Sequence, residues 1–252
     1  MSETYGDVDS SSDPAGAVAW QERMARWPAI AAYKRRSCEL LGNAAPVIDV
    51  GCGPGDDVVA LGVRRCVGVD HSHVMCARAA ERGAVVVRAD AETLPLADRS
   101  VSGVRADRVL QHVAAPRSAL GELVRILRPG SRVVIADPDQ SSLTIHLADV
   151  RPSVLTRLIR LRREIGYRSG QWIARAPSML QDLDVEVIAV ETFALTLDDP
   201  ADAFGLPAWP VIWKQQGGFT DEEISEWNTA MNHPADFTYG VTFVVVAGLK
   251  RS

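Results

Sequence analysis

Apolar residues follow two spacings along the chain, and these predict its helices and strands. Between residues 47 and 136, short apolar runs bounded by glycine, proline or aspartate are typical of buried strands. Stretches with helical spacing separate most of these runs. The expected strands are 47–50, 66–70, 85–88, 101–106 and 132–136, and the expected helices are 57–61, 73–82 and 118–127. This alternation predicts an α/β fold with a mostly parallel sheet and helices on both faces.

The flanking segments complete the expected architecture. Residues 17–41 have a helical pattern that is interrupted at Pro28, and residues 141–182 also have a helical pattern. Two late apolar runs, 185–197 and 241–249, predict two more strands and bring the sheet to seven. A helix is expected near residues 221–231. We therefore predict one domain over residues 1–252, with an N-terminal arm (1–32) that acts as a lid and two cap segments (140–182 and 198–238).

Composition narrows the possible partners. The 252 residues carry a formal net charge of −5, and 47% of them are hydrophobic. An acidic balance argues against nucleic acid as a partner, because such proteins usually carry a basic surface. No apolar run reaches the roughly 18 residues of a membrane span, and the acidic N-terminus does not resemble a signal peptide. The four cysteines have no disulfide or zinc-site spacing, so we expect a cytoplasmic protein. We also expect a monomer or a homodimer.

The strongest local motif is a glycine-rich loop directly after the first buried strand. Glycine occupies positions 51, 53 and 55, so a ligand can approach the backbone closely there. The competing interpretation is a dinucleotide-binding loop, which requires G-x-G-x-x-G. Counted from Gly51, the last glycine of that motif is replaced by Asp56, and a second acid follows at Asp57. Two carboxylates at a helix start oppose a pyrophosphate. A ligand without phosphates fits this loop better.

Aspartates follow the next two strands. Asp70 ends the second strand and predicts a carboxylate that accepts hydrogen bonds from both hydroxyls of a ribose. Asp90 and Ala91 follow the third strand, where a carboxylate and a backbone N–H can bind the amino group and a ring nitrogen of adenine. Taken singly, each aspartate is also typical of a loop. Together with the glycine loop, they predict a crevice for an adenosine that carries no phosphate.

In order and spacing, these residues resemble the class I S-adenosylmethionine-dependent methyltransferases, in particular the ubiquinone/menaquinone-biosynthesis type and its small-molecule relatives in secondary metabolism. The resemblance spans about residues 33–140 and rests on VIDVGCGPG (47–55), VGVDHSHVM (67–75), RADAETLPLADRSVSGV (88–104), RVLQHV (108–113) and ELVRILRPGSRVVIAD (122–137). It implies a Rossmann-like fold and S-adenosyl-L-methionine as cofactor, with S-adenosyl-L-homocysteine as the product.

The resemblance also implies a set of cofactor contacts at the strand ends and on the helix before the glycine loop. Asp49 and Gly51 would face the methionine part, and the backbone of Arg108 would meet its amine. Arg36 would pair with the carboxylate of the cofactor. The full set of expected cofactor-binding residues is Tyr33, Arg36, Asp49, Gly51, Gly53, Asp70, His71, Met75, Asp90, Ala91 and Arg108.

Methyl transfer depends mainly on holding the acceptor in line with the methyl group, and it needs a base only where the acceptor must lose a proton. His112 and His146 follow the fourth and fifth expected strands and are the candidate bases. For each, the alternative is a structural or exposed histidine. Asp137 and Asp139 have no evident third ligand, so we expect no metal site.

The aromatic residues indicate the kind of substrate. All 15 lie outside residues 34–166, in the expected arm and cap. Substrate pockets are typically lined by such side chains, although many of these rings also hold a cap together. We therefore predict transfer of a methyl group to an O, C or N atom of a largely apolar small molecule. The high alanine and arginine content favours bacterial secondary metabolism. The alternative is an enzyme of the same fold that catalyses a non-methylating reaction, such as a cyclisation, with the cofactor in a structural or electrostatic role.

Overall fold

One mixed sheet organises the part of the chain that the computed structural model describes, which is residues 8–232, 234 and 236–251. Its strands are β1 (Val47–Val50), β2 (Cys66–Asp70), β3 (Val86–Arg88), β4 (Val101–Asp107), β5 (Leu127–His146), β6 (Val185–Leu197) and β7 (Thr238–Lys250). Their order across the sheet is β3-β2-β1-β4-β5-β7-β6. The pairs among β1 to β5 are parallel, and β7 runs antiparallel to both of its neighbours. This confirms the predicted fold class and the seven-stranded sheet.

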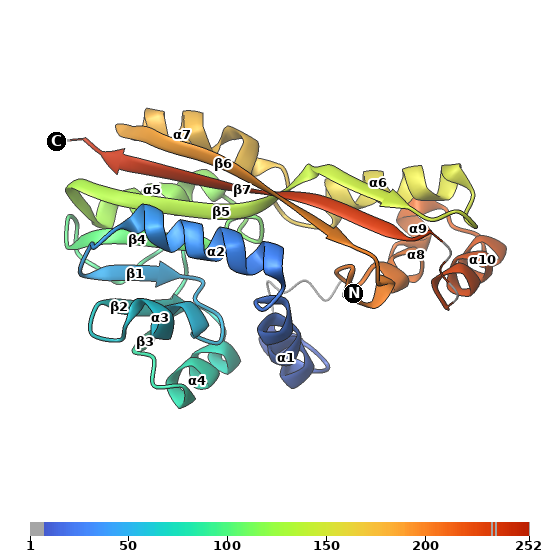
Figure 1. The fold of residues 1–252 in the computed structure, drawn as a ribbon, viewed down its shortest axis with the longest axis horizontal. Helices are drawn as coiled ribbons and strands as arrows, with labels where there is room; N and C mark the ends of the chain where they lie inside the picture. The colour runs from blue at the N-terminus through green and yellow to red at the C-terminus, as the bar shows by residue number, and fades with distance from the viewer. Residues whose placement is uncertain (1–7, 233, 235, 252) are drawn as a thin grey trace.

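Helices cover both faces of the sheet (Figure 1). Many of them have a proline in the first turn, where the fixed φ of proline already matches the helix. The helix that begins at His73 is capped by Ser72, whose Oγ accepts from the backbone N–H of Met75 at 3.2 Å. The α-helices are α1 (Pro14–Met24), α2 (Pro28–Leu41), α3 (Asp56–Leu61), α4 (His73–Glu81), α5 (Pro116–Ile126), α6 (Pro152–Ile165), α7 (Ala176–Asp182), α8 (Trp209–Ile212), α9 (Lys214–Gly217) and α10 (Asp221–Asn232). Short 3₁₀ helices lie at Val8–Ser10 (η1), Trp172–Arg175 (η2), Pro200–Asp202 (η3) and Leu206–Ala208 (η4).

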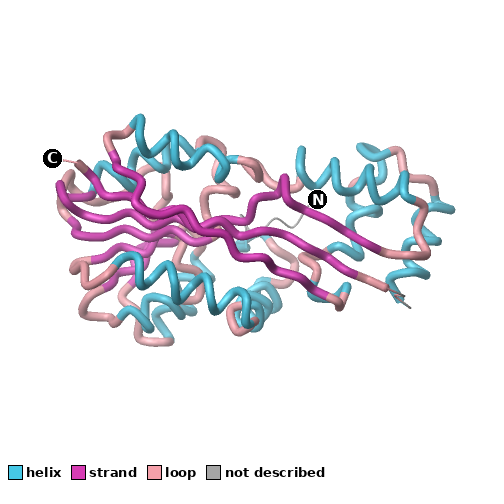
Figure 2. Tube along the Cα trace, turned by 45° about the horizontal axis from the view of Figure 1, so that its top comes forward, coloured by secondary structure: helices cyan, strands magenta, loops and turns pink. Residues whose placement is uncertain are grey.

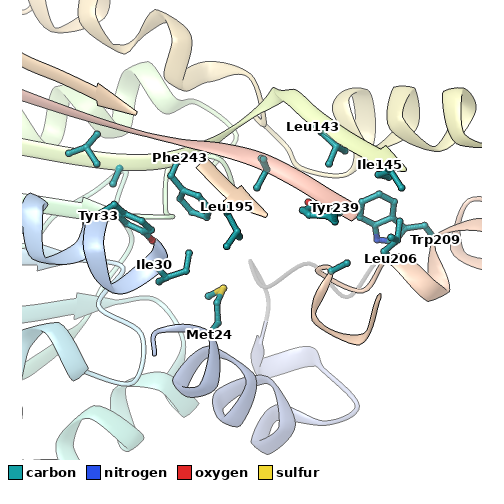
Figure 3. Close-up of a cluster of buried hydrophobic side chains, with 14 of the residues drawn as sticks. Met24, Ile30, Tyr33, Leu143, Ile145, Leu195, Leu206, Trp209, Tyr239 and Phe243 are labelled. Atoms are coloured by element: carbon teal, nitrogen blue, oxygen red, sulfur yellow. The ribbon is translucent and has the colours of Figure 1, made fainter. Parts of the chain in front are cut away.

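Two apolar clusters lie on the two faces of the sheet. One joins α5 and α7 to the sheet residues Ile48, Val104 and Ile135. The other joins α2, α3 and α4 to the opposite face and continues without a break into the rings of the cap. Figure 3 shows part of this second cluster, in which Tyr33 and Phe243 stack at the sheet, and Tyr239 of β7 lies beside Trp209 of the cap. The sheet and the cap therefore share one core.

Strands β5, β6 and β7 extend beyond the shorter parallel strands and carry the cap helices α6 and α8–α10 at their far end (Figures 1 and 2). Strand β5 is 20 residues long, whereas the apolar pattern predicted that it ends at residue 136 and is followed by helical structure from residue 141. That expectation was wrong for residues 141–146. Leu143 and Ile145 are buried while Thr144 and His146 are exposed, which is the two-residue period of a strand. Within the described residues, no helix has both the length and the apolar character that a membrane span requires.

Candidate active site

A cavity of about 240 Å³ opens at the carboxyl ends of the parallel strands. Open α/β sheets typically bind their ligands at this edge. Residues from the arm, from the loops after β1 to β4 and from the cap line it together. The predicted site residues that line this cavity are Asp49, Gly51, Gly53, Asp70, His71, Met75, Asp90, Ala91, Arg108 and His112.

The loop after β1 has a shape that only glycine allows at its first position. Gly51 has a φ of +67°, and a Cβ atom there would lie 2.1 Å from Cγ2 of Val109. The backbone N–H groups of Gly51 and Cys52 both donate to the carbonyl oxygen of Val69, at 2.7 and 3.1 Å. The loop is thus fixed against β2 while it lines the cavity, and any larger residue at position 51 would displace Val109 or the loop.

Asp70 connects the end of β2 to the glycine loop. Its Oδ2 accepts from the backbone N–H of Gly53 at 2.8 Å, and its Oδ1 accepts from that of Ser72 at 2.9 Å. Burial raises the pKa of Asp70, and the two backbone donors oppose this rise. Each carboxylate oxygen has a second lone pair. The side chain is therefore held in place and retains acceptor capacity beside the cavity.

The loop after β3 supplies a second acceptor. Asp90 is exposed at the rim, where its Oδ1 accepts from the backbone N–H of Glu92 at 2.8 Å, and Ala91 is buried beside it. Met75 is buried in the first turn of α4, and the imidazole of His71 lies 3.6 Å from the Asp70 carboxylate. The positions predicted for the ribose and the adenine therefore lie around the same cavity.

A buried cluster of charges lies beneath the glycine loop and ties together β1, β4, α2 and α3. Arg105 is almost fully buried and forms ion pairs with Asp49 at 2.9 Å, Asp57 at 3.0 Å and Asp107 at 2.9 Å. Lys34 pairs with Asp57 and, at 3.0 Å, with Asp107. Burial alone would raise the pKa of Asp107, but Lys34 and Arg105 outweigh it and hold that pKa below its ordinary value. Asp107 thus stays ionised at the cavity floor, whereas burial raises the pKa of Asp49 to about 6.

Helix α2 presents a different cation to the cavity from the one predicted. Lys34 lines it, whereas Arg36 does not and instead pairs with Glu191 at 2.8 Å and Glu39 at 3.1 Å. Tyr33 also lies outside the cavity lining, although its hydroxyl donates to Oδ1 of Asp107 at 2.9 Å. The structure therefore does not bring Tyr33 and Arg36 to the cavity. Which side chains of α2 face the cavity depends on how the helix is rotated about its axis, and the sequence alone did not define that rotation.

Arg108 has an unusual backbone conformation directly after β4. Its φ is +59°, which is rare for a residue with a side chain, and its backbone N–H donates to the carbonyl oxygen of Ala136 at 2.7 Å. Nη1 lies 3.3 Å from the sulfur of Met24, and the buried Nε has no hydrogen-bond partner within the described residues. Strained backbone of this kind often occurs at functional sites. Nε lies 3.7 Å from Oδ1 of Asp107, an ion-pair distance too long for a hydrogen bond, so its N–H remains a donor at the cavity wall.

His112 lines the cavity beside the cap. Its ring meets Tyr167 edge to face, with 5.2 Å between the ring centroids. Burial, together with the charges of Arg108 and Arg162, lowers the pKa of His112 to about 3, so the imidazole is neutral at physiological pH. His146, by contrast, is exposed at the end of β5, where it pairs with Thr238, and it does not line the cavity.

Aromatic rings of the arm and the cap close the remaining side. Trp20, Tyr167, Phe204 and Phe243 line the cavity, and the rings of Trp20 and Phe204 lie 5.3 Å apart. Val8 and Gln21 of the arm also line it, so the arm contributes to the wall. Tyr5 and the remainder of residues 1–7 lie outside the described residues, so the part of the predicted lid that they form is not described.

The two aspartates considered as metal ligands are engaged within the protein. Oδ2 of Asp137 accepts from Nε1 of Trp172 at 2.8 Å and from the backbone N–H of Gln111 at 3.2 Å. Oδ1 of Asp139 accepts from the backbone N–H of Ser141 at 2.9 Å. The residues that the structure describes contain no cluster of three or more histidine, cysteine or acidic side chains arranged to hold a metal ion.

Residues 48–135, which include β1 to β4 and the loops around the cavity, match the family model described as a methyltransferase domain. This part of the chain is therefore similar to methyltransferase domains. A solved structure, the YcgJ protein from Bacillus subtilis, supports the fold of this domain. It has a TM-score of 0.58 at 18% identity and covers 88% of this chain and 99% of its own. The family resemblance inferred from the sequence motifs is therefore confirmed.

Two bacterial relatives match parts of this chain. A protein of a Streptomyces fradiae transposon, described as an uncharacterized 37.1 kDa protein, is 39% identical over 166 residues, which make up 61% of this chain and 48% of that protein. A demethylmenaquinone methyltransferase of Mycolicibacterium paratuberculosis is 28% identical over 146 residues, which make up 57% of this chain and 64% of that enzyme. The matched parts therefore cover less than two thirds of either relative.

Proposed function

We propose that this chain is an S-adenosylmethionine-dependent methyltransferase that acts on a largely apolar small molecule. The observation that carries the proposal is the convergence of the Gly51–Gly53 loop, the Asp70 carboxylate and the Asp90–Ala91 turn on one cavity. A glycine cradle with two acceptor carboxylates suits an adenosine without phosphates. The carboxylate pair at Asp56 and Asp57 disfavours a dinucleotide in the same loop.

The residues present fit the expected cofactor, as the donor and acceptor groups indicate. Asp70 and Asp90 supply acceptors for hydroxyl and amino groups, and Gly51 leaves a space that a Cβ atom would fill. In this proposal, Lys34 and Arg108, whose Nε has no hydrogen-bond partner within the described residues, hold the carboxylate of the cofactor. The family resemblance implied Arg36 in this role. His71 and Met75 flank the nucleoside.

The chemistry asks little covalent help from the protein, because S-adenosylmethionine supplies a methyl group on a sulfonium that is already a good leaving group. The chain's own residues must therefore hold the acceptor in line and exclude water, and positioning of this kind is worth up to about 7–11 kcal/mol. His112 and Tyr167 would orient the acceptor. The arm would close the cavity as a lid, since Trp20 and Gln21 of α1 line it.

The aromatic lining and a relative named for demethylmenaquinone support a small-molecule acceptor. The acceptor atom, O, C or N, and a setting in bacterial secondary metabolism form part of the proposal. Given the low pKa of His112, the imidazole is a weak base, so acceptors that are already nucleophilic suit this site best. Cytoplasmic location and a monomeric or dimeric state also belong to the proposal.

Calorimetry with S-adenosylhomocysteine and NAD tests the cofactor assignment. We expect the first to bind with a dissociation constant in the micromolar range and NAD to give no response. Lys34→Met should weaken binding of S-adenosylhomocysteine about tenfold or more, because it removes a charge-assisted contact. Arg36→Met, two residues along the same helix, is the matched control and should leave binding within about twofold of wild type. Binding of NAD alone would overturn the proposal.

Turnover distinguishes methylation from the alternative reaction. The protein is incubated with S-adenosylmethionine and a panel of aromatic small molecules, and the mixture is analysed by mass spectrometry. Methylation adds one methyl group to an acceptor and releases an equal amount of S-adenosylhomocysteine. A compound that changes structure without gaining a methyl group, while the cofactor stays intact, would favour the non-methylating alternative.

A further inference from the structure

The cavity wall formed by the arm, the cap and the segments after β4 and β5 differs in charge from the wall formed by the glycine loop. We call this wall the acceptor side, because it lies beyond the residues assigned to the cofactor. Its lining includes Trp20, His112, Tyr167, Arg168 and Phe204, together with Pro138 of β5. Among them, Arg168 is the side chain that carries a charge at neutral pH, since His112 is neutral there. The acceptor side is therefore aromatic and cationic.

No carboxylate of the described residues neutralises Arg168. Its side chain is exposed at the cavity rim and forms no ion pair or hydrogen bond within the described part of the chain. The carboxylates that line the cavity lie elsewhere. Those of Asp49, Asp57 and Asp107 are paired with Lys34 and Arg105 in the buried cluster. The charge of Arg168 is thus available to a ligand.

A second arginine supports the same wall from behind. Arg162 is buried, and its guanidinium lies 4.2 Å from the ring centroid of Tyr167 and 4.6 Å from that of Trp209. Its Nη2 donates to the hydroxyl oxygen of Tyr167 at 2.6 Å, and its buried Nε has no partner in the described residues. Buried arginines are usually paired with carboxylates. Here the described residues provide no such carboxylate for Arg162, so its charge also favours an anion nearby.

The remaining nearby acid does not cancel these charges. Asp137 lies behind the acceptor side, where its Oδ2 accepts from the backbone N–H of Gln111, and burial raises its pKa well above the ordinary value. Burial therefore favours the uncharged acid at that position. Asp139, on the same strand, is held by Ser141 through two hydrogen bonds. Neither Asp137 nor Asp139 forms an ion pair with Arg162 or Arg168 within the described residues, and Glu92, which also lines the cavity, accepts from the backbone N–H of Ala115 at 3.0 Å.

We propose that the acceptor side binds an anionic aromatic compound, whose acidic group pairs with Arg168 and whose ring packs between Tyr167 and Phe204. The inference rests on the proposed function and narrows its substrate class from a largely apolar molecule to an aromatic acid. Aromatic packing supplies the affinity, and the ion pair at the rim fixes the orientation of the compound. Because Tyr167 is held by Arg162, the ring that the substrate contacts is fixed in position.

Two probes of equal shape and different charge test the proposal. Binding of 2-naphthoate and of 2-naphthamide to the full chain saturated with S-adenosylhomocysteine is measured by calorimetry. We expect the acid to bind at least about tenfold more tightly than the amide, with the preference shrinking at high salt because the ion pair is exposed. In Arg168→Gln, the acid and the amide should bind within about threefold of each other.

Arg160→Gln is the matched control. Arg160 is also an exposed arginine of the cap without an ion pair in the described residues, but it does not line the cavity. This variant should keep the full preference for the acid, and both variants should bind the amide as wild type does, which shows that the pocket is intact. Equal binding of both probes to wild type, binding of neither, or a preference that survives Arg168→Gln would each overturn the proposal. Failure to bind S-adenosylhomocysteine would instead count against the proposed function.

Discussion

Asp70 is held by two backbone donors in a buried position, and this makes it the most informative single residue of the site. A carboxylate fixed in this way does not have to reorganise when a ligand arrives. Replacing Asp70 by asparagine keeps the shape but removes the charge, so each hydrogen bond from the ligand loses its ionic acceptor. The loss is about 1.5–3 kcal/mol.

We therefore expect Asp70→Asn to bind S-adenosylhomocysteine roughly 10- to 150-fold more weakly in calorimetry. Asp149→Asn, a change in an exposed aspartate outside the cavity lining, serves as the control and should bind as wild type does. Circular dichroism checks that the variant is folded, since a side-chain amide at this position would accept from only one of the two backbone donors. Affinity within twofold of wild type in a folded variant would contradict the assignment of Asp70.

His112 makes the stability of the protein depend on pH in a defined direction. Its pKa is about 3 in the folded state, against about 6.5 in an unfolded chain, because burial and neighbouring arginines disfavour the imidazolium. Between these values the unfolded state binds more protons, so stability falls as pH is lowered through 6.5 and is unaffected by His112 above about pH 7.5. At pH 5 the penalty amounts to about 2 kcal/mol.

Lowering the pH from 7.5 to 5 should therefore reduce the melting temperature of wild type more than that of His112→Gln, by about 4–8 °C. Differential scanning calorimetry at the two pH values gives this difference directly. His73→Gln, a change in an exposed histidine on α4, is the control and should follow wild type. An equal pH response of His112→Gln and wild type would mean that His112 is not held neutral.

For single residues, the sequence predicted which kinds of residue form the site better than it predicted which way their side chains point. Aspartates and glycines at strand ends lie at the cavity, because the end of a strand fixes where the chain emerges. On α2, by contrast, neighbouring residues point about 100° apart, so the choice between Lys34 and Arg36 depends on the helical phase. The buried positions Tyr33, Ser37 and Leu40 set that phase, and Arg36 falls outside it, beside Glu191.

Among the elements, η1 of the arm is held at the start of α4 by the side chain of Asp9, and α1 is held by ion pairs of Glu22 with Arg78 and Arg82. Asp9 in η1 accepts from the backbone N–H of His73 at 2.8 Å and that of Val74 at 3.2 Å, at the start of α4. Burial alone would raise the pKa of Asp9, but these donors and Ser72 lower it to about 2. Removing a cap of this kind typically costs about 0.5–2 kcal/mol. The arm should therefore open more readily without it.

Hydrogen exchange tests whether the arm acts as a lid. In wild type, exchange in α1 should slow when S-adenosylhomocysteine is added, because Trp20 and Gln21 line the cavity. In Asp9→Ala, exchange in residues 8–24 should be faster than in wild type without ligand and should slow again when ligand is added. Asp198→Ala, a change in an exposed aspartate on the loop after β6, should behave as wild type. If the exchange rate of α1 is the same with and without S-adenosylhomocysteine, the arm is a permanent part of the cavity wall and not a lid.

Element boundaries were predictable where the signal is local. Strands β1, β2 and β6 have the expected bounds, because short apolar runs end at glycine or aspartate. The last ten residues of β5 were not predicted, because proline and polar residues interrupt the apolar run there. The strand continues to His146 because β7 pairs with it over that length. Pairing between segments about 100 residues apart leaves little local trace in a sequence.

For the whole molecule, the decisive feature is a core that runs from the sheet into the cap without a break. All six tryptophans lie outside residues 34–166, so fluorescence reports mainly the arm and the cap, with Trp172 packed against the sheet, whereas circular dichroism reports every element. If the chain unfolds as the single domain that the sequence predicted, the two signals should give one coincident thermal transition. S-adenosylhomocysteine at about 100 times its dissociation constant should raise both by the same amount, about 5–11 °C, corresponding to about 2.7 kcal/mol. Two separate transitions, of which the ligand shifts only one, would show that the cap folds independently of the sheet.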